Sequence, residues 1–348
     1  MIDPKDSRIW VDGCFDFAHH GHAGAMLQAR QLGKELYVGV HSDEEILNNK
    51  GPPVMTMDER MTAVNACKWS TKAIENAPYV TEPEFIKSYG CQYVVHGDDI
   101  TTDKDGNDCY QEVKDLGIFL VVKRTPNIST TDLVGRMLLM TKEHHYSNLD
   151  TKIGYENLIQ KDNVSRFENY ATDETGLNKG SLVSIYHNSN IEILVEPKSK
   201  LEKVVYVDGA FDLFHPGHIN LLKEIKEKAE DEDAKVVVGI YDDFTINQYR
   251  GSNYPIMNVF ERSLCVLQCK YVDGIIINAP REVNEKEKFL KSVKENIGTV
   301  VDVFPTEDFD SKYIINRVLE NRDVYEQRQI KKGYKAKIEK DLKDKEDL

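Results

Sequence analysis

The chain has 348 residues and a formal net charge of −14, and 40% of its residues are hydrophobic. This length exceeds that of one typical compact core and favours two domains. The negative charge repels the phosphates of nucleic acids and therefore argues against nucleic acid as a partner. No apolar run is long enough to cross a bilayer, and the N-terminus lacks the apolar region of a secretory signal.

The six cysteines are scattered through the chain and form no Cys-x-x-Cys pair. This spacing predicts neither a zinc site nor a disulfide framework. We therefore expect a reduced, cytoplasmic protein with no metal site built from its own side chains.

The first 142 residues alternate short apolar runs with helical patterns, which predicts an α/β domain with a parallel sheet. Strands are expected at 9–11, 36–40, 93–95 and 119–122, and helices at 23–32, 59–66 and 108–116. Thr56 with Glu59, and Thr81 with Glu84, have the spacing of capping boxes at helix starts. Residues 1–142 are therefore interpreted as one domain.

The middle and the end of the chain differ from this pattern. Residues 143–203 are rich in Asn, Asp, Thr and Lys with weak periodicity, so we expect an irregular connector with a short strand at 191–195. Residues 204–325 return to the α/β pattern and are interpreted as a second domain. The tail at 326–348 is heavily charged and carries a thin apolar line: Ile330, Tyr334, Ile338 and Leu342. We expect a solvated helix there, too sparse in apolar residues for a membrane anchor.

An internal repeat organises the chain. Residues 10–22 read WVDGCFDFAHHGH, and residues 206–218 read YVDGAFDLFHPGH. The match continues downstream, with Lys50-Gly51, Glu59-Arg60 and Asn76-Ala77-Pro78 facing Arg250-Gly251, Glu261-Arg262 and Asn278-Ala279-Pro280. The sequence therefore predicts a tandem duplication of one domain.

The histidine motif of each copy follows a predicted strand and opens a predicted helix. A helix start offers unpaired N–H groups and a positive dipole end to a phosphate. His19 and His22 are three residues apart and can face one phosphate from the same side, while Gly21 allows close approach. A single such pair could equally serve to cap or pack the helix, but its presence in the same frame in both copies favours a phosphate site.

Together with Lys50 and residues 124–131 (RTPNISTT), this motif resembles the cytidylyltransferase family of nucleotidyltransferases, whose marks are HxGH and RTxGISTT. The tandem arrangement, with residues 96–100 (HGDDI) and 76–79 (NAPY), is similar to the members of that family that act on phosphoethanolamine. The resemblance covers nearly all of the chain outside the connector and tail. It implies an α/β fold of two tandem Rossmann-like nucleotidyltransferase domains with parallel sheets.

The reaction that the resemblance implies is a direct displacement at phosphorus. The phosphate of phosphoethanolamine attacks CTP and releases pyrophosphate, giving CDP-ethanolamine for phosphatidylethanolamine synthesis. His19 and His22 would stabilise the transition state, and Lys50 and Arg124 would offset phosphate charge. Mg²⁺ bound to CTP is the expected cofactor.

The resemblance also implies binding roles. It assigns to CTP the residues Asp12, Gly13, Phe15, Gly21, His96, Asp98, Ser129, Thr130 and Thr131, and to phosphoethanolamine the residues Tyr79, Asp99 and Tyr110. Taken singly, Lys50 and Arg124 would more often be solvated charges, Asp12 could equally cap a turn, and Phe15 favours the core.

The acid and aromatic residues near the phosphoalcohol suit either ethanolamine or choline. The duplicated architecture favours phosphoethanolamine, because the choline enzymes of the family pair one catalytic domain with a membrane-binding helix.

The second copy departs further from the family pattern than the first. In the first copy, Asn127 stands where the family has Gly, and Asn tolerates the left-handed backbone that such a loop uses. The second copy keeps His215 and His218 but has no HGDD segment, and residues 304–310 (FPTEDFD) stand roughly where the phosphate-binding segment is expected. We therefore expect turnover in the first copy alone, with the roles of His215 and His218 left open.

Other functions remain as alternatives at this point. They are a phosphocholine or glycerol-phosphate cytidylyltransferase, an adenylyltransferase, and a non-catalytic nucleotide-sensing protein. A class I aminoacyl-tRNA synthetase would need a KMSKS-type loop, which the sequence lacks. The sequence leaves open whether the chain forms a homodimer or contacts a membrane surface peripherally.

Overall fold

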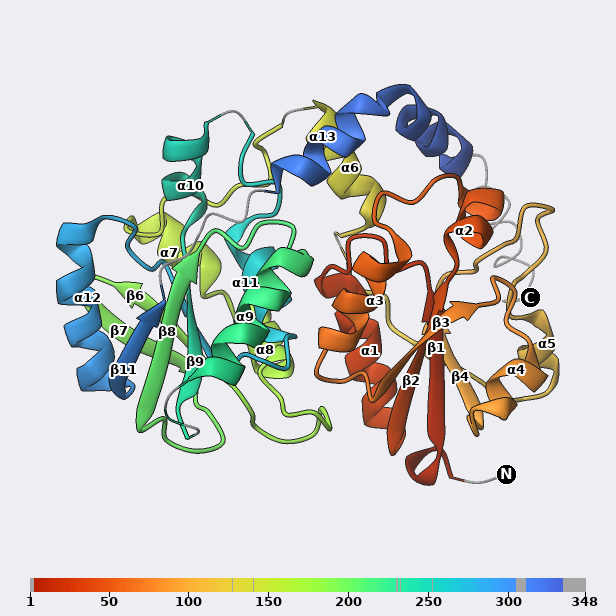
Figure 1. The fold of residues 1–348 in the computed structure, drawn as a ribbon, viewed down its shortest axis with the longest axis horizontal. Coiled ribbons are helices and arrows are strands. Elements are labelled where there is room, and N and C mark those ends of the chain that lie inside the picture. Colours follow the sequence, from red (N-terminus) through yellow and green to blue (C-terminus); the bar gives the residue numbers. More distant parts are fainter. Residues whose placement is uncertain are drawn as a thin grey trace. The chain divides into compact units, whose positions relative to one another are not determined.

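The computed structural model describes residues 3–126, 128–139, 141–229, 231, 233–251, 253–304 and 311–333. The chain divides into two compact units (Figure 1). Unit 1 comprises Met1–Leu138 together with Lys312–Leu348, and unit 2 comprises Leu139–Ser311. None of the described helices is long and apolar enough to cross a membrane.

Unit 1 contains a five-stranded sheet in the order β3-β2-β1-β4-β5, with every pair of neighbours parallel. Its strands are β1 (Arg8–Gly13), β2 (Glu35–His41), β3 (Lys72–Ala77), β4 (Tyr93–Gly97) and β5 (Phe119–Val122). The chain order reverses beside β1, so the carboxyl ends of β1 and β4 flank a topological switch point where α/β sheets bind ligands. The predicted parallel sheet is confirmed.

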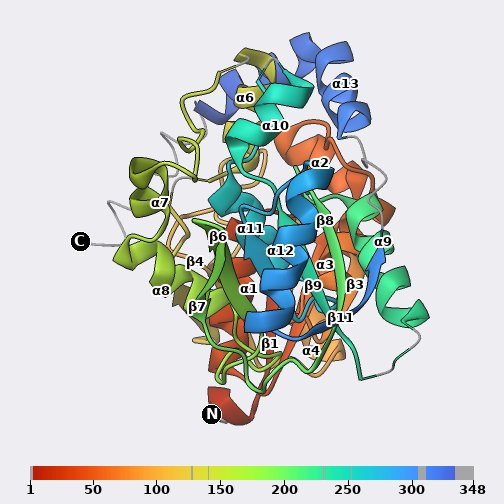
Figure 2. The same ribbon diagram turned by 90° about the vertical axis from the view of Figure 1, so that its left-hand side faces the viewer.

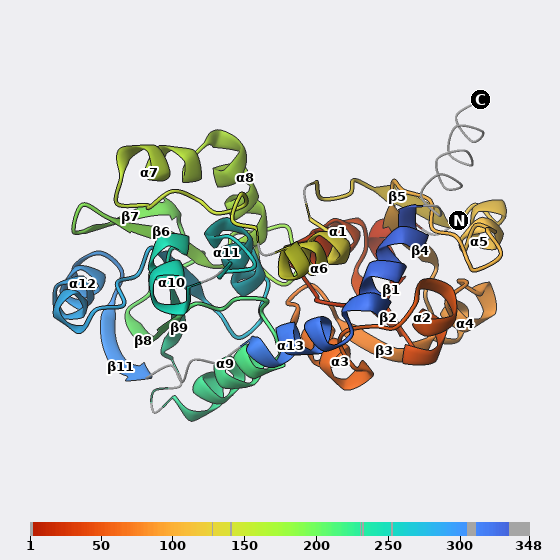
Figure 3. The same cartoon turned by 90° about the horizontal axis from the view of Figure 1, so that it is seen from above.

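Helices cover both faces of this sheet. The helices of unit 1 are α1 (His20–Leu32), α2 (Asp43–Lys50), α3 (Met57–Ala66), α4 (Pro83–Ser88), α5 (Gln111–Asp115), α6 (Thr130–Leu139) and α13 (Lys312–Glu320), with a short 3₁₀ turn, η1, at Pro4–Asp6. α1 and α3 lie on one side of the strands, and α4 and α5 on the other (Figures 1 and 3). Trp10 and Val94 pack with Ile86 of α4 and Val113 of α5 in one buried cluster.

Two predicted capping boxes have different outcomes. The box at the start of α3 is confirmed, because the Thr56 side chain accepts from the Glu59 N–H and Glu59 accepts from the Thr56 N–H. The box predicted at Thr81 is wrong: α4 begins at Pro83 without a side-chain cap. The Thr81 hydroxyl instead donates to buried Asp12 at 2.6 Å, a partner that no local spacing reveals.

Unit 2 contains a six-stranded sheet in the order β11-β8-β9-β10-β6-β7. Its strands are β6 (Leu182–His187), β7 (Asn190–Val195), β8 (Lys203–Gly209), β9 (Lys235–Ile240), β10 (Gly274–Ile277) and β11 (Thr299–Phe304). β8 to β11 repeat the order of β1 to β4, and all their pairings are parallel. No described strand corresponds to β5. The antiparallel hairpin β6–β7 extends the opposite edge, beside β10.

The expected irregular connector at 143–203 is therefore wrong. It forms α7 (Lys152–Leu158), α8 (Lys161–Tyr170) and the β6–β7 hairpin, and it is part of unit 2. The hairpin extends the sheet beside β10, and β6 is buried over its first four residues; both strands are too short for the sequence pattern to indicate them. The short strand expected at 191–195 is confirmed as β7.

The remaining helices of unit 2 are α9 (Pro216–Lys228), α10 (Asp243–Arg250), α11 (Val259–Leu267) and α12 (Val283–Asn296). Figure 2 shows α12 lying across one face of the sheet. Phe289 and Val293 of α12 pack there against Tyr206, Val237 and Ile276 of three strands.

The C-terminal segment differs from the predicted boundaries, which ended the second domain at 325. From Lys312 onward it belongs to unit 1, and residues 322–333 are helical after α13. The helix is as expected, but it is not simply solvated: Tyr325 is 3% exposed and its hydroxyl donates to the Pro53 carbonyl. The apolar positions Tyr334, Ile338 and Leu342 lie outside the described residues.

Candidate active site

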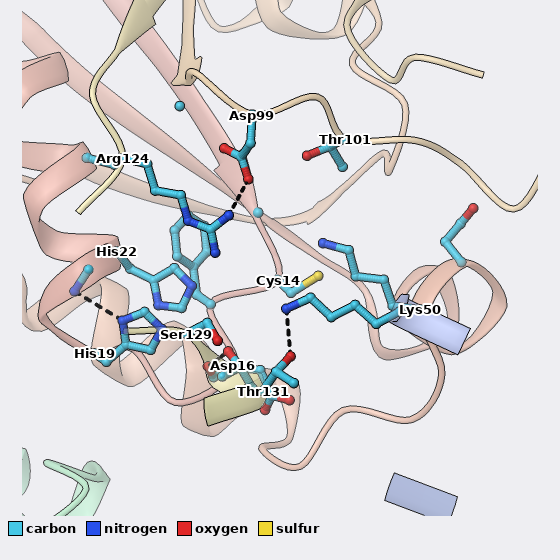
Figure 4. A pocket seen from close by; sticks show the side chains of 18 of the residues that line it. Cys14, Asp16, His19, His22, Lys50, Asp99, Thr101, Arg124, Ser129 and Thr131 are labelled. Carbon is cyan, nitrogen blue, oxygen red and sulfur yellow. Dashed lines mark hydrogen bonds and ion pairs between the residues drawn. The ribbon is translucent and has the colours of Figure 1, made fainter. Parts of the chain in front are cut away.

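A pocket of about 420 Å³ opens in unit 1 at the carboxyl ends of β1, β4 and β5. The first turns of α1 and α6 and the end of α2 also line it, together with residues of the C-terminal segment (Figure 4). Of the residues predicted from the sequence, the lining includes Asp12, Gly13, Phe15, His19, Gly21, His22, Lys50, His96, Asp99, Arg124, Ser129, Thr130 and Thr131. Three predicted residues are not part of the lining: Tyr79, Asp98 and Tyr110.

The histidine pair is positioned by the start of α1. His19 is the N-cap, and its Nδ1 accepts a hydrogen bond from the Gly21 N–H at 3.1 Å. In a neutral imidazole this leaves the proton on Nε2, so His19 presents a donor at Nε2. The His22 ring stacks on the His19 ring with centroids 3.9 Å apart. Within the described residues, the buried His19 Nε2 and His22 Nδ1 have no hydrogen-bond partner.

Both histidines are neutral at neutral pH. Burial, followed by the charges of Lys50 and Arg124, lowers the pKa of His22 to about 3. Burial and the adjacent His22 and His20 lower the pKa of His19 well below its usual value. Two buried neutral rings with unsatisfied nitrogens are costly unless a ligand completes them, so this geometry points to a bound polar group.

A second helix start faces the same pocket. Ser129 precedes α6, and its hydroxyl accepts from the Asp132 N–H and donates to the Asp132 carboxylate. The Thr130 hydroxyl donates to the Asp16 carbonyl at 2.9 Å. These two predicted phosphate-binding hydroxyls therefore already have intramolecular partners. Of the first-turn N–H groups of α6, those of Thr130 and Thr131 remain for a ligand, together with the positive dipole end of the helix.

Cations line the pocket around these helix starts. Lys50 ends α2. Electrostatic interaction with Cys14 raises the pKa of Lys50, burial opposes this rise, and Tyr79 adds to it. Arg124 follows β5 and donates through Nη1 to Asp99 Oδ2 at 2.8 Å (Figure 4). The Arg124 N–H lies 3.3 Å from Asp98 Oδ1, so Asp98 supports the backbone beside the pocket.

Asp12 forms the floor of the pocket. Its carboxylate accepts from Trp10 Nε1 at 2.9 Å, the Thr81 hydroxyl at 2.6 Å and the Tyr110 hydroxyl at 2.7 Å. Three donors fix this buried carboxylate. Tyr110 therefore lies behind the lining and does not reach into the pocket. Tyr79 is also buried, at 3% exposed, and packs against the His41 ring.

Phe15, which the sequence favours as a core residue, is buried, as are Trp10 and Phe17. Phe15 also borders the pocket, where its ring meets the edge of His22 with centroids 5.4 Å apart. Phe15 is therefore both a core residue and part of the pocket wall, the two places predicted for it from the sequence. The Asn127 position lies outside the described residues.

Unit 2 retains the frame of this site. Asp212 accepts from the Ile256 and Met257 N–H groups, just as Asp16 accepts from the Val54 and Met55 N–H groups. The Ser311 hydroxyl donates to the Asp212 carbonyl at 2.9 Å. This bond matches that of Thr130 with Asp16, so α13 is the counterpart of α6 in the second copy. Residues 305–310, most of the altered segment, lie outside the described residues.

The contents of the second site differ. His218 Nδ1 accepts from the His215 N–H at 3.2 Å, so this histidine closes a capping box. Lys286 pairs with Asp208 at 2.9 Å, whereas the corresponding Asp12 accepts from Trp10, Thr81 and Tyr110. In the described part of unit 2 no strand matches β5, and no described segment corresponds to residues 98–124, which include Asp99 and Arg124.

The fold and the paired helix starts over a cationic pocket define a nucleotidyltransferase, and comparison with known proteins agrees. The cytidylyltransferase-like family model matches residues 10–136 and 206–343. The chain belongs to the cytidylyltransferase-like family.

Several relatives resemble the chain over nearly its whole length. The ethanolamine-phosphate cytidylyltransferase of Saccharomyces cerevisiae is 41% identical, covering 95% of this chain and 98% of that protein. The ethanolamine-phosphate cytidylyltransferase of Dictyostelium discoideum is 38% identical, covering 95% and 96% respectively. In contrast, choline-phosphate cytidylyltransferase A of Mus musculus, 39% identical, aligns with only 38% of this chain.

One group of lining residues, from the C-terminal segment, was not predicted from the sequence. They are Tyr325, Arg328, Gln329, Lys331 and Lys332. The cationic positions 328 and 332 are four apart and share a helix face, a signal that was present in the sequence. Nothing local indicated that this face covers a pocket formed some 200 residues earlier, as the contact between Lys332 and Thr131 shows.

Proposed function

We propose that the pocket of unit 1 transfers the cytidylyl group of CTP to phosphoethanolamine, giving CDP-ethanolamine and pyrophosphate. The observation that carries this proposal is the stacked pair His19 and His22. Their buried, unpartnered ring nitrogens lie beside two helix starts, with Lys50 and Arg124 in the same pocket. Such a site is complementary to a polyphosphate.

The reaction needs no nucleophile from the protein. A phosphate oxygen of phosphoethanolamine forms a bond to the α-phosphorus of CTP, while the bond from that phosphorus to the bridging oxygen of the β-phosphate breaks. The electron pair leaves with pyrophosphate. Charge grows on the oxygens around the α-phosphorus, where the His19 Nε2–H can donate and where Lys50 and Arg124 offset the charge.

Phosphoethanolamine is the proposed acceptor because the relatives that match this chain throughout carry ethanolamine phosphate in their names. A primary ammonium needs hydrogen-bond acceptors. Asp99 lines the pocket with a side chain 44% exposed, and we assign it this role. Tyr79 and Tyr110 shape the wall behind it.

Mg²⁺ belongs to the proposal as an ion bound by the CTP phosphates. The described residues contain no group of three His, Cys, Asp or Glu side chains that could hold a metal. Asp12 and Asp16, the buried carboxylates of the pocket, already accept several protein donors. The ion would supply further neutralisation of phosphate charge. We propose a cytoplasmic reaction, because all six cysteines are in the reduced thiol form, as is usual in a reducing compartment.

The direct test is pyrophosphate release in the presence of Mg²⁺. CTP and ATP would each be combined with phosphoethanolamine, phosphocholine and glycerol 3-phosphate. The proposal predicts the fastest release with CTP and phosphoethanolamine. A preference for phosphocholine would keep the mechanism and overturn the substrate assignment. CTP binding without release from any pair would support a nucleotide-sensing protein instead.

A further inference from the structure

The C-terminal segment is anchored to unit 1 by polar contacts around the loop that follows α2. Arg317 of α13 donates through Nη1 to the Val54 carbonyl at 2.6 Å and to Glu59 Oε2 at 2.8 Å. Its Nη2 lies 3.2 Å from Glu59 Oε1, so the ion pair is bidentate. The Tyr325 hydroxyl adds a bond to the Pro53 carbonyl. These contacts hold the start of the 322–333 helix beside the pocket.

The helix then brings cations into the pocket itself. Arg328 Nη1 donates to the Pro52 carbonyl at 2.8 Å and lies 3.3 Å from Asp16 Oδ2. Lys332 Nζ donates to the Thr131 hydroxyl at 2.6 Å, in the first turn of α6. Both side chains line the pocket together with Lys50 and Arg124.

Part of this positive charge is paired, Arg124 with Asp99 and Arg328 with Asp16, but all four cations converge on one pocket. Burial lowers the pKa of Lys332, and repulsion from Lys50 and Arg124 lowers it further, while Asp132 opposes the shift. The Asp16 carboxylate already accepts the Val54 and Met55 N–H groups. Cations that converge from separate segments repel one another unless an anion joins them.

The contact of Lys332 is of a kind that a phosphate can replace. The Lys332 ammonium has three donors, and its partner at Thr131 is a neutral hydroxyl. A hydrogen bond from an ammonium to a phosphate oxygen is stronger than one to a neutral acceptor. Lys332 also lies at the α6 start, where first-turn N–H groups and the dipole favour an anion.

We propose that Arg328 and Lys332 bind the β- and γ-phosphates of CTP, so that the C-terminal helix forms part of the substrate site. The inference rests on the proposed function, because it takes CTP as the occupant of the pocket. It assigns a binding role to a segment that the sequence indicated only as a solvated helix.

The test compares the affinities for CTP and CMP, because CMP lacks the two phosphates that these cations would contact. Calorimetry would use the full-length chain as wild type, Arg328→Gln, Lys332→Met and the control Arg322→Gln. Arg322 lies on the same helix, pairs with Glu326 at 2.7 Å and is outside the pocket lining. Loss of one charge-assisted bond predicts about tenfold weaker CTP binding for Arg328→Gln and Lys332→Met, with CMP binding unchanged.

Lys332→Arg serves as the conservative variant and should recover most of the affinity for CTP. It also keeps the test decisive if Lys332→Met fails to fold, since circular dichroism would identify that failure. Equal losses for CTP and CMP would overturn the inference and assign the residues to shaping the pocket. Unchanged affinity for CTP would overturn it too, and a higher turnover in either variant would indicate an inhibitory contact instead.

These outcomes are separate from the fate of the proposed function. If the wild type releases no pyrophosphate from CTP with phosphoethanolamine, the proposed function is wrong. If it does, and both variants keep the wild-type ratio of CTP to CMP affinity, only the role of the C-terminal helix is wrong.

Discussion

Gly21 sets how closely the starts of α1 and α6 approach each other. A Cβ atom at this position would lie 2.7 Å from Ile128 Cγ2 and 2.9 Å from His19 Cε1 and Nδ1. These atoms would have to move, because carbon atoms in contact normally stay about 3.5–4.0 Å apart. Ile128 is buried at 5% exposed, and His19 Nδ1 is held by the Gly21 N–H, so neither can yield without disturbing the site.

The substitution Gly21→Ala should therefore reduce catalysis more than stability. Overpacking costs about 1–3 kcal/mol, which corresponds to roughly a 5- to 150-fold loss of kcat/KM if it falls on the reacting geometry. Alanine also favours the helix by up to about 1 kcal/mol, which offsets part of the cost to folding. Steady-state pyrophosphate release and urea denaturation would measure the two effects.

Gly135→Ala provides the matched control, since it adds the same methyl group to α6. The nearest atom to its Cβ would be Gln329 Nε2 at 4.0 Å, an ordinary contact. It should keep kcat/KM within about twofold of wild type. Wild-type kinetics for Gly21→Ala would refute the reasoning that the spacing of the two helix starts matters.

Three further predictions concern stability and the C-terminal segment. Folding lowers the pKa of His22 to about 3, whereas the unfolded state keeps a pKa of about 6.5. Between these two values only the unfolded state binds the proton, so the free energy of unfolding should fall as the pH drops through this range. Urea denaturation at several pH values should show a shallower decline for His22→Asn than for wild type, and parallel declines would contradict the assignment. Arg317→Leu should loosen residues 312–333 and raise the KM for CTP, as hydrogen exchange and kinetics would show, whereas unchanged exchange would exclude the anchoring role. Arg60→Met should lower the stability by about 1–3 kcal/mol, because it leaves the Cys14 and His41 carbonyls without their buried donor, whereas Asp43 is half exposed and stays solvated; thermal denaturation close to that of wild type would be the opposing result.

Most of the features that depend on local spacing in the sequence were predicted correctly. The duplicated motif, the parallel strands and the Thr56 capping box depend on local spacing, and the structure confirms them. The histidine pair was predicted to lie between a strand and a helix, and this position is confirmed. The structure adds the stacking of the His19 ring on the His22 ring.

The failures arose where a partner lies far away in the chain. Thr81 had capping-box spacing, but the buried Asp12 carboxylate offers its hydroxyl a stronger acceptor. Residues 143–203 lacked clear periodicity because β6 and β7 are short and gain stability by joining the edge at β10. The C-terminal helix docks through polar contacts such as Arg317 with Glu59, which an apolar stripe does not reveal.

The most direct test of the central claim compares equivalent histidines in the two copies. Pyrophosphate release from CTP with Mg²⁺ and phosphoethanolamine would be measured for wild type, His22→Ala and His218→Ala. If the pocket of unit 1 carries the reaction, loss of a transition-state donor predicts about a 10²- to 10³-fold lower kcat for His22→Ala. His218→Ala should retain turnover, because His218 Nδ1 serves a helix cap. Full activity in His22→Ala, or loss confined to His218→Ala, would contradict the account.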